Sequence, residues 1–179
     1  SDLFGTFRQR EAVGSASASK GPFAVSVSAN AFDSDGYRVN NRLQQRNAVG
    51  DFRYTVEGGS AYLNISMDDQ KLGLPGFRHV TLTSSEVDSD PTGATTPTAF
   101  ANKEGISATL GFTRIVTDGV EMIVDGGMRQ KKQTTFSSLS GFDTSDVRTL
   151  TTYSLTPRLV AQGSVFGMPS KVTTRSEEH

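Results

Sequence analysis

The chain has 179 residues, a formal net charge of −1 and no cysteine. The lack of cysteine excludes a disulfide scaffold, thiolate chemistry and a cysteine-based zinc site. A net charge near zero provides no basic field of the kind that attracts nucleic acid, so no nucleic-acid partner is expected. Hydrophobic residues make up only 35% of the chain. No apolar run reaches the roughly 18 residues that a transmembrane helix needs.

About eight β-strands are predicted. In chain order they are residues 3–19, 22–32, 48–57, 60–69, 105–116, 120–135, 147–161 and 165–174. Three short turns, Lys20-Gly21, Gly58-Gly59 and Thr117-Asp118-Gly119, each contain a glycine that can adopt the positive φ of hairpin turns. Around these turns apolar and polar residues alternate, which places them on opposite faces of a sheet. The pattern therefore predicts an all-β, antiparallel meander with one apolar and one polar face.

The turns also predict a register. A two-residue loop at Gly58-Gly59 pairs Val56 with Ala61, Tyr54 with Leu63 and Phe52 with Ile65. By the same arithmetic, Ala18 pairs with Phe23 at the first turn, and Val116 with Val120 and Phe112 with Val124 at the third. A slip of one residue would move the whole apolar set to the polar face. We therefore expect Phe52, Tyr54, Leu63, Ile65, Phe112 and Val124 on one face, opposite Arg53, Asn64 and Ser66.

Three positions interrupt this pattern. Before Ala12 the first strand loses its alternation, which predicts a bulge or the exit of the strand from an apolar layer. Arg114 is the one charge on an apolar stripe, and its long side chain could snorkel from a position near the short turn. Pro157 lies inside the seventh strand, where it must occupy a bulge or a position that requires no donor.

Short and long connections alternate along the chain. Long polar connections are expected at about residues 33–46, 68–104 and 130–148. All short turns would then lie at one end of the strands, and all long loops at the other. Bacterial outer-membrane barrels have this layout, with the apolar face toward lipid and the polar face toward the lumen. Long structureless loops are unusual in compact soluble domains, so the loop lengths favour a segment of a transmembrane β-barrel.

Five stretches at the expected strand ends carry a family resemblance. They are Phe4-Gly5-Thr6-Phe7-Arg8, Asp35-Gly36-Tyr37-Arg38-Val39-Asn40-Asn41, Gln45-Arg46-Asn47-Ala48-Val49-Gly50, Gln70-Lys71-Leu72-Gly73-Leu74-Pro75-Gly76 and Tyr153-Ser154-Leu155-Thr156-Pro157-Arg158-Leu159. In this order they resemble the N-terminal part of the barrel in TonB-dependent outer-membrane receptors. Val39 replaces an acidic residue of that family's pattern. The resemblance covers the chain up to about Pro169.

The resemblance implies that residues 1–174 are a partial barrel and residues 175–179 a tail. Receptors of this family have barrels of about 22 strands, preceded by a plug domain and a short box that engages TonB. Neither plug nor box is found in this chain, which is therefore expected to be a piece of a longer protein. For that parent protein, the resemblance implies a bacterial outer-membrane location, lipid as a neighbour, and energised uptake of a ferric siderophore or a similar scarce nutrient. TonB would act only through the plug.

No motif for enzymatic chemistry, a cofactor or a metal site is found, so a non-enzymatic protein is predicted. Asp33-Ser34-Asp35-Gly36 and Glu86-Val87-Asp88-Ser89-Asp90 place acidic residues at alternate positions, as calcium loops do, but neither completes a known spacing. The candidate ligand-binding residues lie at the first long loop: Tyr37, Arg38, Arg42 and Arg46. Their guanidinium groups suit an anionic ligand such as a ferric chelate. Bonds to loop backbone or to lipopolysaccharide phosphates are an equally good interpretation.

The competing hypothesis is a self-contained eight-stranded barrel or sandwich that acts as a binding or structural module. An even strand number near eight permits closure. Against this hypothesis, Val165, Gly167, Pro169 and Lys171 give the last predicted strand no apolar stripe. An open sheet would instead have two unpaired edges and an uncovered apolar face. In water, such a chain is expected to self-associate, to require detergent, or to fold back as a sandwich.

Overall fold

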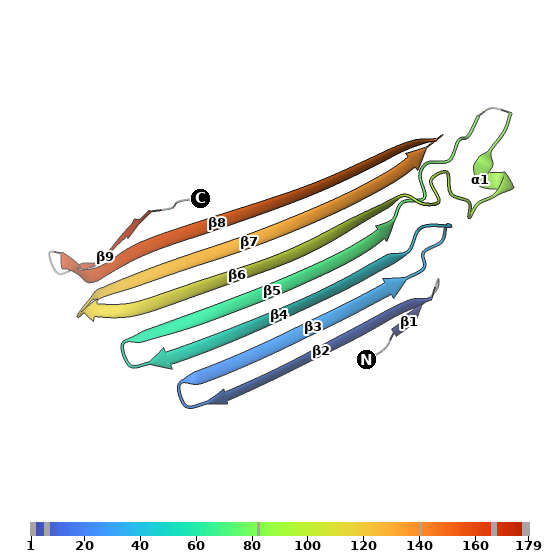
Figure 1. Ribbon diagram of the computed structural model, residues 1–179. Helices are drawn as coiled ribbons and strands as arrows, with labels where there is room; N and C mark the ends of the chain where they lie inside the picture. The colour runs from blue at the N-terminus through green and yellow to red at the C-terminus, as the bar shows by residue number, and fades with distance from the viewer. Residues whose placement is uncertain (1–2, 6–7, 82, 140, 166–167, 177–179) are drawn as a thin grey trace.

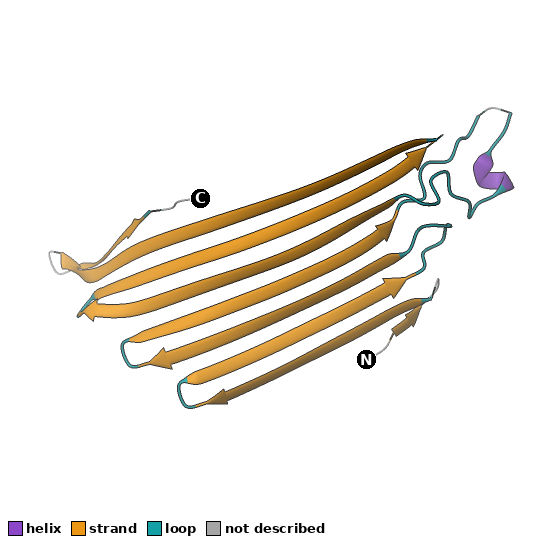
Figure 2. Ribbon diagram, in the orientation of Figure 1, coloured by secondary structure: helices purple, strands orange, loops and turns teal. Residues whose placement is uncertain are grey.

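The computed structural model shows a single antiparallel sheet (Figures 1 and 2). It describes residues 3–5, 8–81, 83–139, 141–165 and 168–176. The strands are β1 (Leu3–Gly5), β2 (Gln9–Lys20), β3 (Phe23–Ser34), β4 (Leu43–Val56), β5 (Gly59–Gly73), β6 (Phe100–Thr117), β7 (Val120–Leu139), β8 (Phe142–Val165) and β9 (Met168–Arg175). Each strand pairs with the next in the chain, from β1 to β9. The predicted antiparallel meander is confirmed.

The sheet is open. Within the described residues the strand order is linear, so β1 and β9 are not joined, and no second layer covers either face (Figure 1). A short helix, α1 (Glu86–Ser89), lies in the long connection between β5 and β6. In the described part of the chain, no helix is long and apolar enough to cross a membrane. Because their order is linear and no second layer covers them, the described strands form neither the closed barrel nor the sandwich of the competing hypothesis.

The short turns that join β2 to β3, β4 to β5 and β6 to β7 lie at one end of the sheet, here called the turn end (Figure 2). The connections over residues 35–42 and 74–99 lie at the opposite end, here called the outer end, together with Gly141. This separation of the two kinds of connection was predicted from the chain order of short and long segments.

The face assignments are confirmed, but the first two turns are displaced. Val25 pairs with Ala18, and Tyr54 pairs with Ala61, which is a shift of two residues from the predicted register in both hairpins. Pro22 lies in the first loop because it has no N–H for a ladder, and Gly21 supplies the positive φ of 58°. A shift of two residues preserves the face of every side chain, since the side-chain period of a strand is two.

The third turn contains a bulge that the sequence did not predict. Phe112 pairs with Val124 as expected, and Gly119 has the expected positive φ of 76°. Val120, however, pairs with Thr117 and not with Val116, and the register shifts between Ile115 and Thr117. The turn is therefore a two-residue loop next to a bulge, where a three-residue loop was expected.

Pro157 occupies a position that requires no donor, as predicted. The pairing of β8 with β9 stops at Arg158, and the Pro157 carbonyl accepts a hydrogen bond from the Ser176 N–H at 3.2 Å. In an extended strand the N–H and C=O of one residue point the same way, so the missing donor faces the end of β9. The ladder with β7 therefore loses no bond at this position.

Two predictions about the outer end are wrong. The connection expected at residues 130–148 does not exist, because β7 and β8 pair continuously from Val120 with Ala161 to Leu139 with Phe142. The first strand does not run from residue 3 to 19 with a bulge: Leu3 pairs with Glu11, so the chain reverses between β1 and β2, next to Arg8 with its φ of 52°. Thr6 and Phe7 of the first family-like stretch lie outside the described residues.

The sheet has an apolar face and a polar face. The apolar face carries Phe23, Val25, Val27, Phe52, Tyr54, Leu63, Ile65, Met67, Ile106, Leu110, Phe112, Val124, Leu155 and Leu159. The polar face carries Ser17, Ser26, Asp51, Arg53, Tyr62, Asn64, Ser66, Ser107, Thr109, Asp125, Ser154 and Arg158. The six apolar and three polar residues named in the sequence prediction lie on the expected faces.

Exposure is inverted relative to a water-soluble protein. On β6, the apolar-face residue Leu110 is 59% exposed, whereas the neighbouring polar-face residues Thr109 and Gly111 are half-buried and buried. Among the described residues only Ala99 and Val160 are buried hydrophobic residues. The sheet therefore has no hydrophobic core, and its polar face is the more enclosed one.

Candidate functional site

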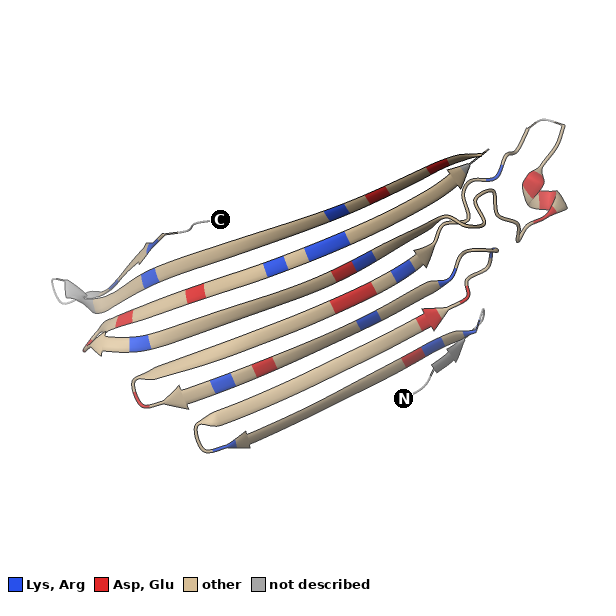
Figure 3. Cartoon of the chain, viewed as in Figure 1, with Lys and Arg blue, Asp and Glu red and all other residues tan. Residues whose placement is uncertain are grey.

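The charged residues of the apolar face lie at its two edges. Figure 3 shows most of the strand charges toward the outer end of β4 to β8, with a smaller set near the turn end. On the apolar face of β6, Glu104 and Arg114 flank the uncharged stretch from Ile106 to Phe112. Arg114 pairs with Gly59 beside the second short turn, where the sequence predicted it. The apolar face is thus an uncharged band with charges at both edges.

A polar cluster crosses four strands near the turn end of the polar face. The Tyr62 hydroxyl on β5 donates to Asp125 Oδ1 on β7 at 3.0 Å, and Arg158 on β8 forms an ion pair with Asp125 Oδ2. Gly111 on β6 lies under the Tyr62 ring, and a Cβ at this glycine would be 2.0 Å from Tyr62 Cε1. Glycine at position 111 therefore allows Tyr62 to reach over one strand to the next.

Other polar groups of this face are also paired, either within one strand or between neighbouring strands. Asp51 accepts a hydrogen bond from Arg53 Nε at 2.6 Å, and the hydroxyls of Ser66 and Ser107 lie 2.7 Å apart. Nearer the outer end, a polar hollow of about 480 Å³ is lined by hydroxyl side chains, Asp68, Arg129 and Lys131. The polar face can therefore contact water or polar solutes along its length.

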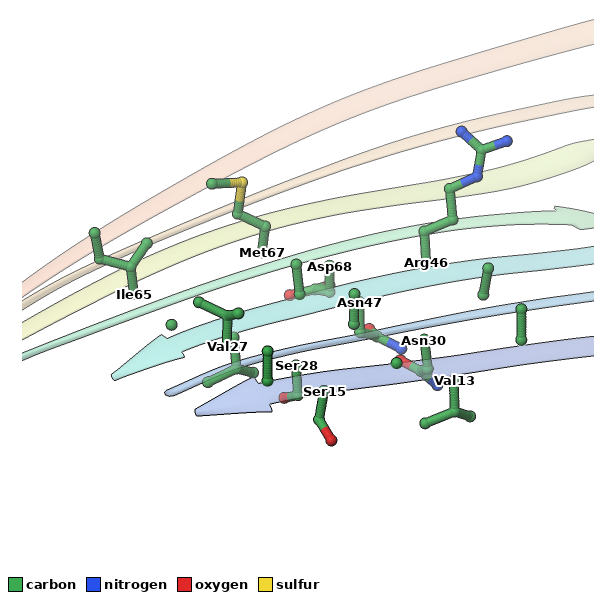
Figure 4. Close-up of a pocket in the computed structure, with 18 of the residues that line it drawn as sticks. Val13, Ser15, Val27, Ser28, Asn30, Arg46, Asn47, Ile65, Met67 and Asp68 are labelled. Atoms are coloured by element: carbon green, nitrogen blue, oxygen red, sulfur yellow. The ribbon is translucent and has the colours of Figure 1, made fainter. Parts of the chain in front are cut away.

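The apolar face has a larger, shallow hollow of about 1130 Å³ over β2 to β5. Small residues such as Gly14, Ala29, Ala48 and Gly50 form its floor. Figure 4 shows Ile65, Met67 and Arg46 on the same side of the sheet, away from Ser15. The small residues explain the hollow, which offers apolar contact and no chemistry.

The first long connection is held by polar side chains. Arg42 donates to both carboxylate oxygens of Asp33, at 3.0 and 2.7 Å, and Gln44 donates to the same carboxylate. The Arg42 guanidinium holds the pKa of the Asp33 carboxyl below its usual value. Arg38 donates to three backbone carbonyls of the connection over residues 74–99. Asp33 and Arg42 thus order the base of this loop, and Arg38 joins it to the next one.

The four predicted ligand-binding residues do not converge on one point. Tyr37 is 51% exposed in the first loop, whereas Arg38 is half-buried against loop carbonyls. Arg42 pairs with Asp33, and Arg46 lies on the apolar-face side of β4, opposite Ala31 and Asp69. The acidic stretches at 33–36 and 86–90 are likewise not gathered, and no group of three or more potential metal ligands occurs among the described residues.

Sequence reasoning did not identify the cluster of Tyr62, Asp125 and Arg158. Part of the signal was present, because the expected register at the third turn already places Gly111 opposite Asp125. The pairing of β5 with β6, which brings Tyr62 to Gly111, spans a connection of 26 residues (74–99) and could not be read from a turn.

Comparison with solved structures finds a related fold. The chain is similar to the unliganded ferric citrate transporter FecA, with a TM-score of 0.70 and 14% sequence identity. The fold is related to that of FecA. The likeness covers 92% of this chain but only 25% of FecA, so the chain spans a quarter of that transporter's length. No family model and no curated protein matches the chain.

Proposed function

We propose that the chain is part of the wall of an outer-membrane transport barrel. Its apolar face would contact lipid, and its polar face would line an aqueous lumen. The observation that carries this proposal is the inverted exposure, because an apolar face with charged edges and no cover needs an apolar solvent. The likeness to the ferric citrate transporter FecA supports a transport role.

The dimensions of the apolar band support the same proposal. Glu104 and Arg114 are ten positions apart on β6. At about 3.4 Å per residue this separation is about 34 Å along the strand. A strand tilt of about 40° reduces it to about 26 Å along the membrane normal, close to the roughly 25 Å apolar band of outer-membrane barrels. Phe23, Tyr54 and Phe112 at the turn-end edge of the band correspond to an aromatic girdle.

The parent protein is proposed to be a TonB-dependent receptor in the bacterial outer membrane that takes up a ferric siderophore or similar chelate. Support comes from the five family-like stretches and from the FecA likeness. TonB would act through a plug domain of the parent protein. Among the candidate ligand-binding residues, Tyr37 is the one we propose to meet ligand, because it is 51% exposed in the first loop. Arg38 binds loop backbone, and Arg42 and Arg46 lie toward the outside of the wall.

Cysteine labelling tests the two faces. The chain has no cysteine, so Ser26→Cys and Val25→Cys each create a single reactive site. In the intact protein in outer membranes, we expect Ser26→Cys to react with a water-soluble maleimide and Val25→Cys to react only with a lipid-soluble one. These neighbours lie on opposite faces of β3. Equal reaction of both variants with the water-soluble reagent would contradict the proposed wall.

The chain by itself provides a second test. Without detergent, we expect the 179-residue chain to sediment as a broad set of oligomers, because its apolar face and both sheet edges lack partners among the described residues. A detergent above its micelle concentration should convert these oligomers to a narrower distribution. Analytical ultracentrifugation measures both states. A sharp monomer with cooperative unfolding in plain buffer would favour the self-contained module instead.

A further inference from the structure

The first and second outer loops contact each other through two side chains of the first and through a backbone hydrogen bond from Val39 N–H to Thr92 O at 2.7 Å. Here the first loop is residues 35–42 and the second is residues 74–99. Arg38 uses three nitrogens: Nε donates to Gly93 O at 3.0 Å, Nη1 to Gly76 O at 2.7 Å, and Nη2 to Pro75 O at 3.3 Å. A single guanidinium thus contacts the second loop near both of its ends.

Asn40 makes a parallel set of contacts. Its amide nitrogen lies 3.2 Å from Leu74 O, 2.8 Å from Thr96 O and 2.7 Å from Ala99 O. Asn40 has a φ of 58°, a left-handed conformation that asparagine tolerates better than most residues. Arg38 and Asn40 therefore each bind carbonyl groups from both the beginning and the later part of the second loop, and they hold these two parts together.

The junction is tightly packed. Ser34, Gly93, Thr96 and Ala99 are all buried there, in a chain that otherwise buries few residues. A Cβ on Gly73 would lie 2.5 Å from Asn40 O. A substitution at this glycine would therefore separate the two loops, since backbone atoms have little freedom to move aside.

We propose that Arg38 and Asn40 are positioning residues that hold the two outer loops together as one body. Arg38 and Asn40 lie in the family-like stretch 35–41, and Gly76 lies in the family-like stretch 70–76. The contacts of Arg38 and Asn40 with the second loop are here called the clasp. In this arrangement Arg38 serves the loop backbone and not the ligand. The inference goes beyond the proposed function, because a barrel wall does not require its outer loops to be joined.

Arg42 provides a matched control. It is a cation of the same loop, but its side chain contacts Asp33 and Asp35, within its own hairpin. If the loss of any arginine of the first loop reduced the order of the second loop, Arg42→Ala would have the same effect as Arg38→Ala. If the clasp is specific, only Arg38→Ala will affect the second loop.

The experiment measures order in the second loop of the intact, membrane-embedded protein. A nitroxide on Val87→Cys reports from α1, where the side chain is 44% exposed and the chain has no competing cysteine. Amide hydrogen exchange is followed over residues 93–99. Arg38→Ala, Arg38→Lys, Asn40→Ala and Arg42→Ala are compared, and a heat-modifiability gel reports whether each variant still forms the barrel.

We expect Arg38→Ala and Asn40→Ala to raise the mobility of the nitroxide and to accelerate exchange over residues 93–99 about tenfold or more, because charged and buried hydrogen bonds are lost. Arg38→Lys should be intermediate, since an ammonium cannot reproduce the guanidinium fork. Arg42→Ala should leave both readouts unchanged. The clasp would be refuted by unchanged exchange in Arg38→Ala, or by equal acceleration in Arg42→Ala. If Arg38→Ala does not form the barrel, the same criterion applies to Arg38→Lys.

Discussion

Val27→Arg is expected to destabilise the membrane-embedded protein by about 2–4 kcal/mol, the cost of a cation at the bilayer midplane of an outer-membrane barrel. Val27 is 48% exposed and lies in the middle of the apolar face, between Ala16 and Gly50. In water, a substitution at such an exposed position would be nearly neutral. The sign and size of the change in stability therefore report whether lipid or water contacts the apolar face.

Ser28→Arg is the matched control for Val27→Arg. Ser28 is the next residue of β3, is exposed, and pairs with Ser15 and Val49 on the polar face. An arginine there would extend into the aqueous lumen, so we expect a change within about 0.5 kcal/mol. Urea titration of the protein in lipid vesicles measures both variants. If the two arginines cost the same, the apolar face does not contact lipid.

Gly111→Ala is expected to cost about 1–3 kcal/mol, the usual penalty for overpacking a well-filled position. The new methyl group would lie 2.0 Å from Tyr62 Cε1 and 2.7 Å from Asp125 Oδ1. Tyr62 would have to leave Gly111 and lose its hydrogen bond to Asp125. The ion pair between Asp125 and Arg158 would then remain to hold the cluster together.

Gly126→Ala is the control for Gly111→Ala. Its methyl group would lie 3.8 Å from Leu155 Cδ1, an ordinary contact, on the apolar face. We expect a neutral or slightly stabilising effect, because alanine restricts the unfolded chain. In the double variant Gly111→Ala with Tyr62→Ser, the space vacated by the ring should relieve most of the strain. The same urea titration applies, and a cost for Gly111→Ala that persists without the Tyr62 ring would contradict the steric explanation.

The sequence was informative where the two faces of the sheet meet different environments. Alternation around Gly21 and Gly58 predicted which side chains share a face, and the structure confirms it even though both turns moved by one residue. A displaced turn changes a register by two, and a period of two leaves the faces unchanged. An error of one residue in the predicted position of a turn therefore does not change the predicted faces.

The sequence was uninformative where both faces are polar. Residues 130–135 and 147–148 were expected in a strand as well as in the long connection, and residues 136–139 and 142–146 in the connection alone, but all of them belong to β7 and β8. Lys131 and Lys132 lie on opposite faces of the same strand, so no alternation distinguishes this segment from a loop. Hydrogen bonding between neighbouring strands, and not side-chain polarity, extends the sheet here.

The candidate site was likewise predictable in part only. Tyr37, Arg38, Arg42 and Arg46 could be selected from the sequence by residue type, but their contacts depend on which loop carbonyls and strand faces come near them. The cluster of Tyr62, Asp125 and Arg158 requires the pairing of β5 with β6 across residues 74–99. No local pattern encodes a pairing between such distant segments.

The sequence by itself determined the antiparallel order, the two faces and the separation of short turns from long loops, because these follow from a local period of two and from glycine in the turns. The tertiary structure decided where the strands end, how the outer loops are joined, and which polar residues meet across strands. Those features depend on backbone hydrogen bonds and side-chain contacts between residues far apart in the chain, such as Arg38 and Gly93.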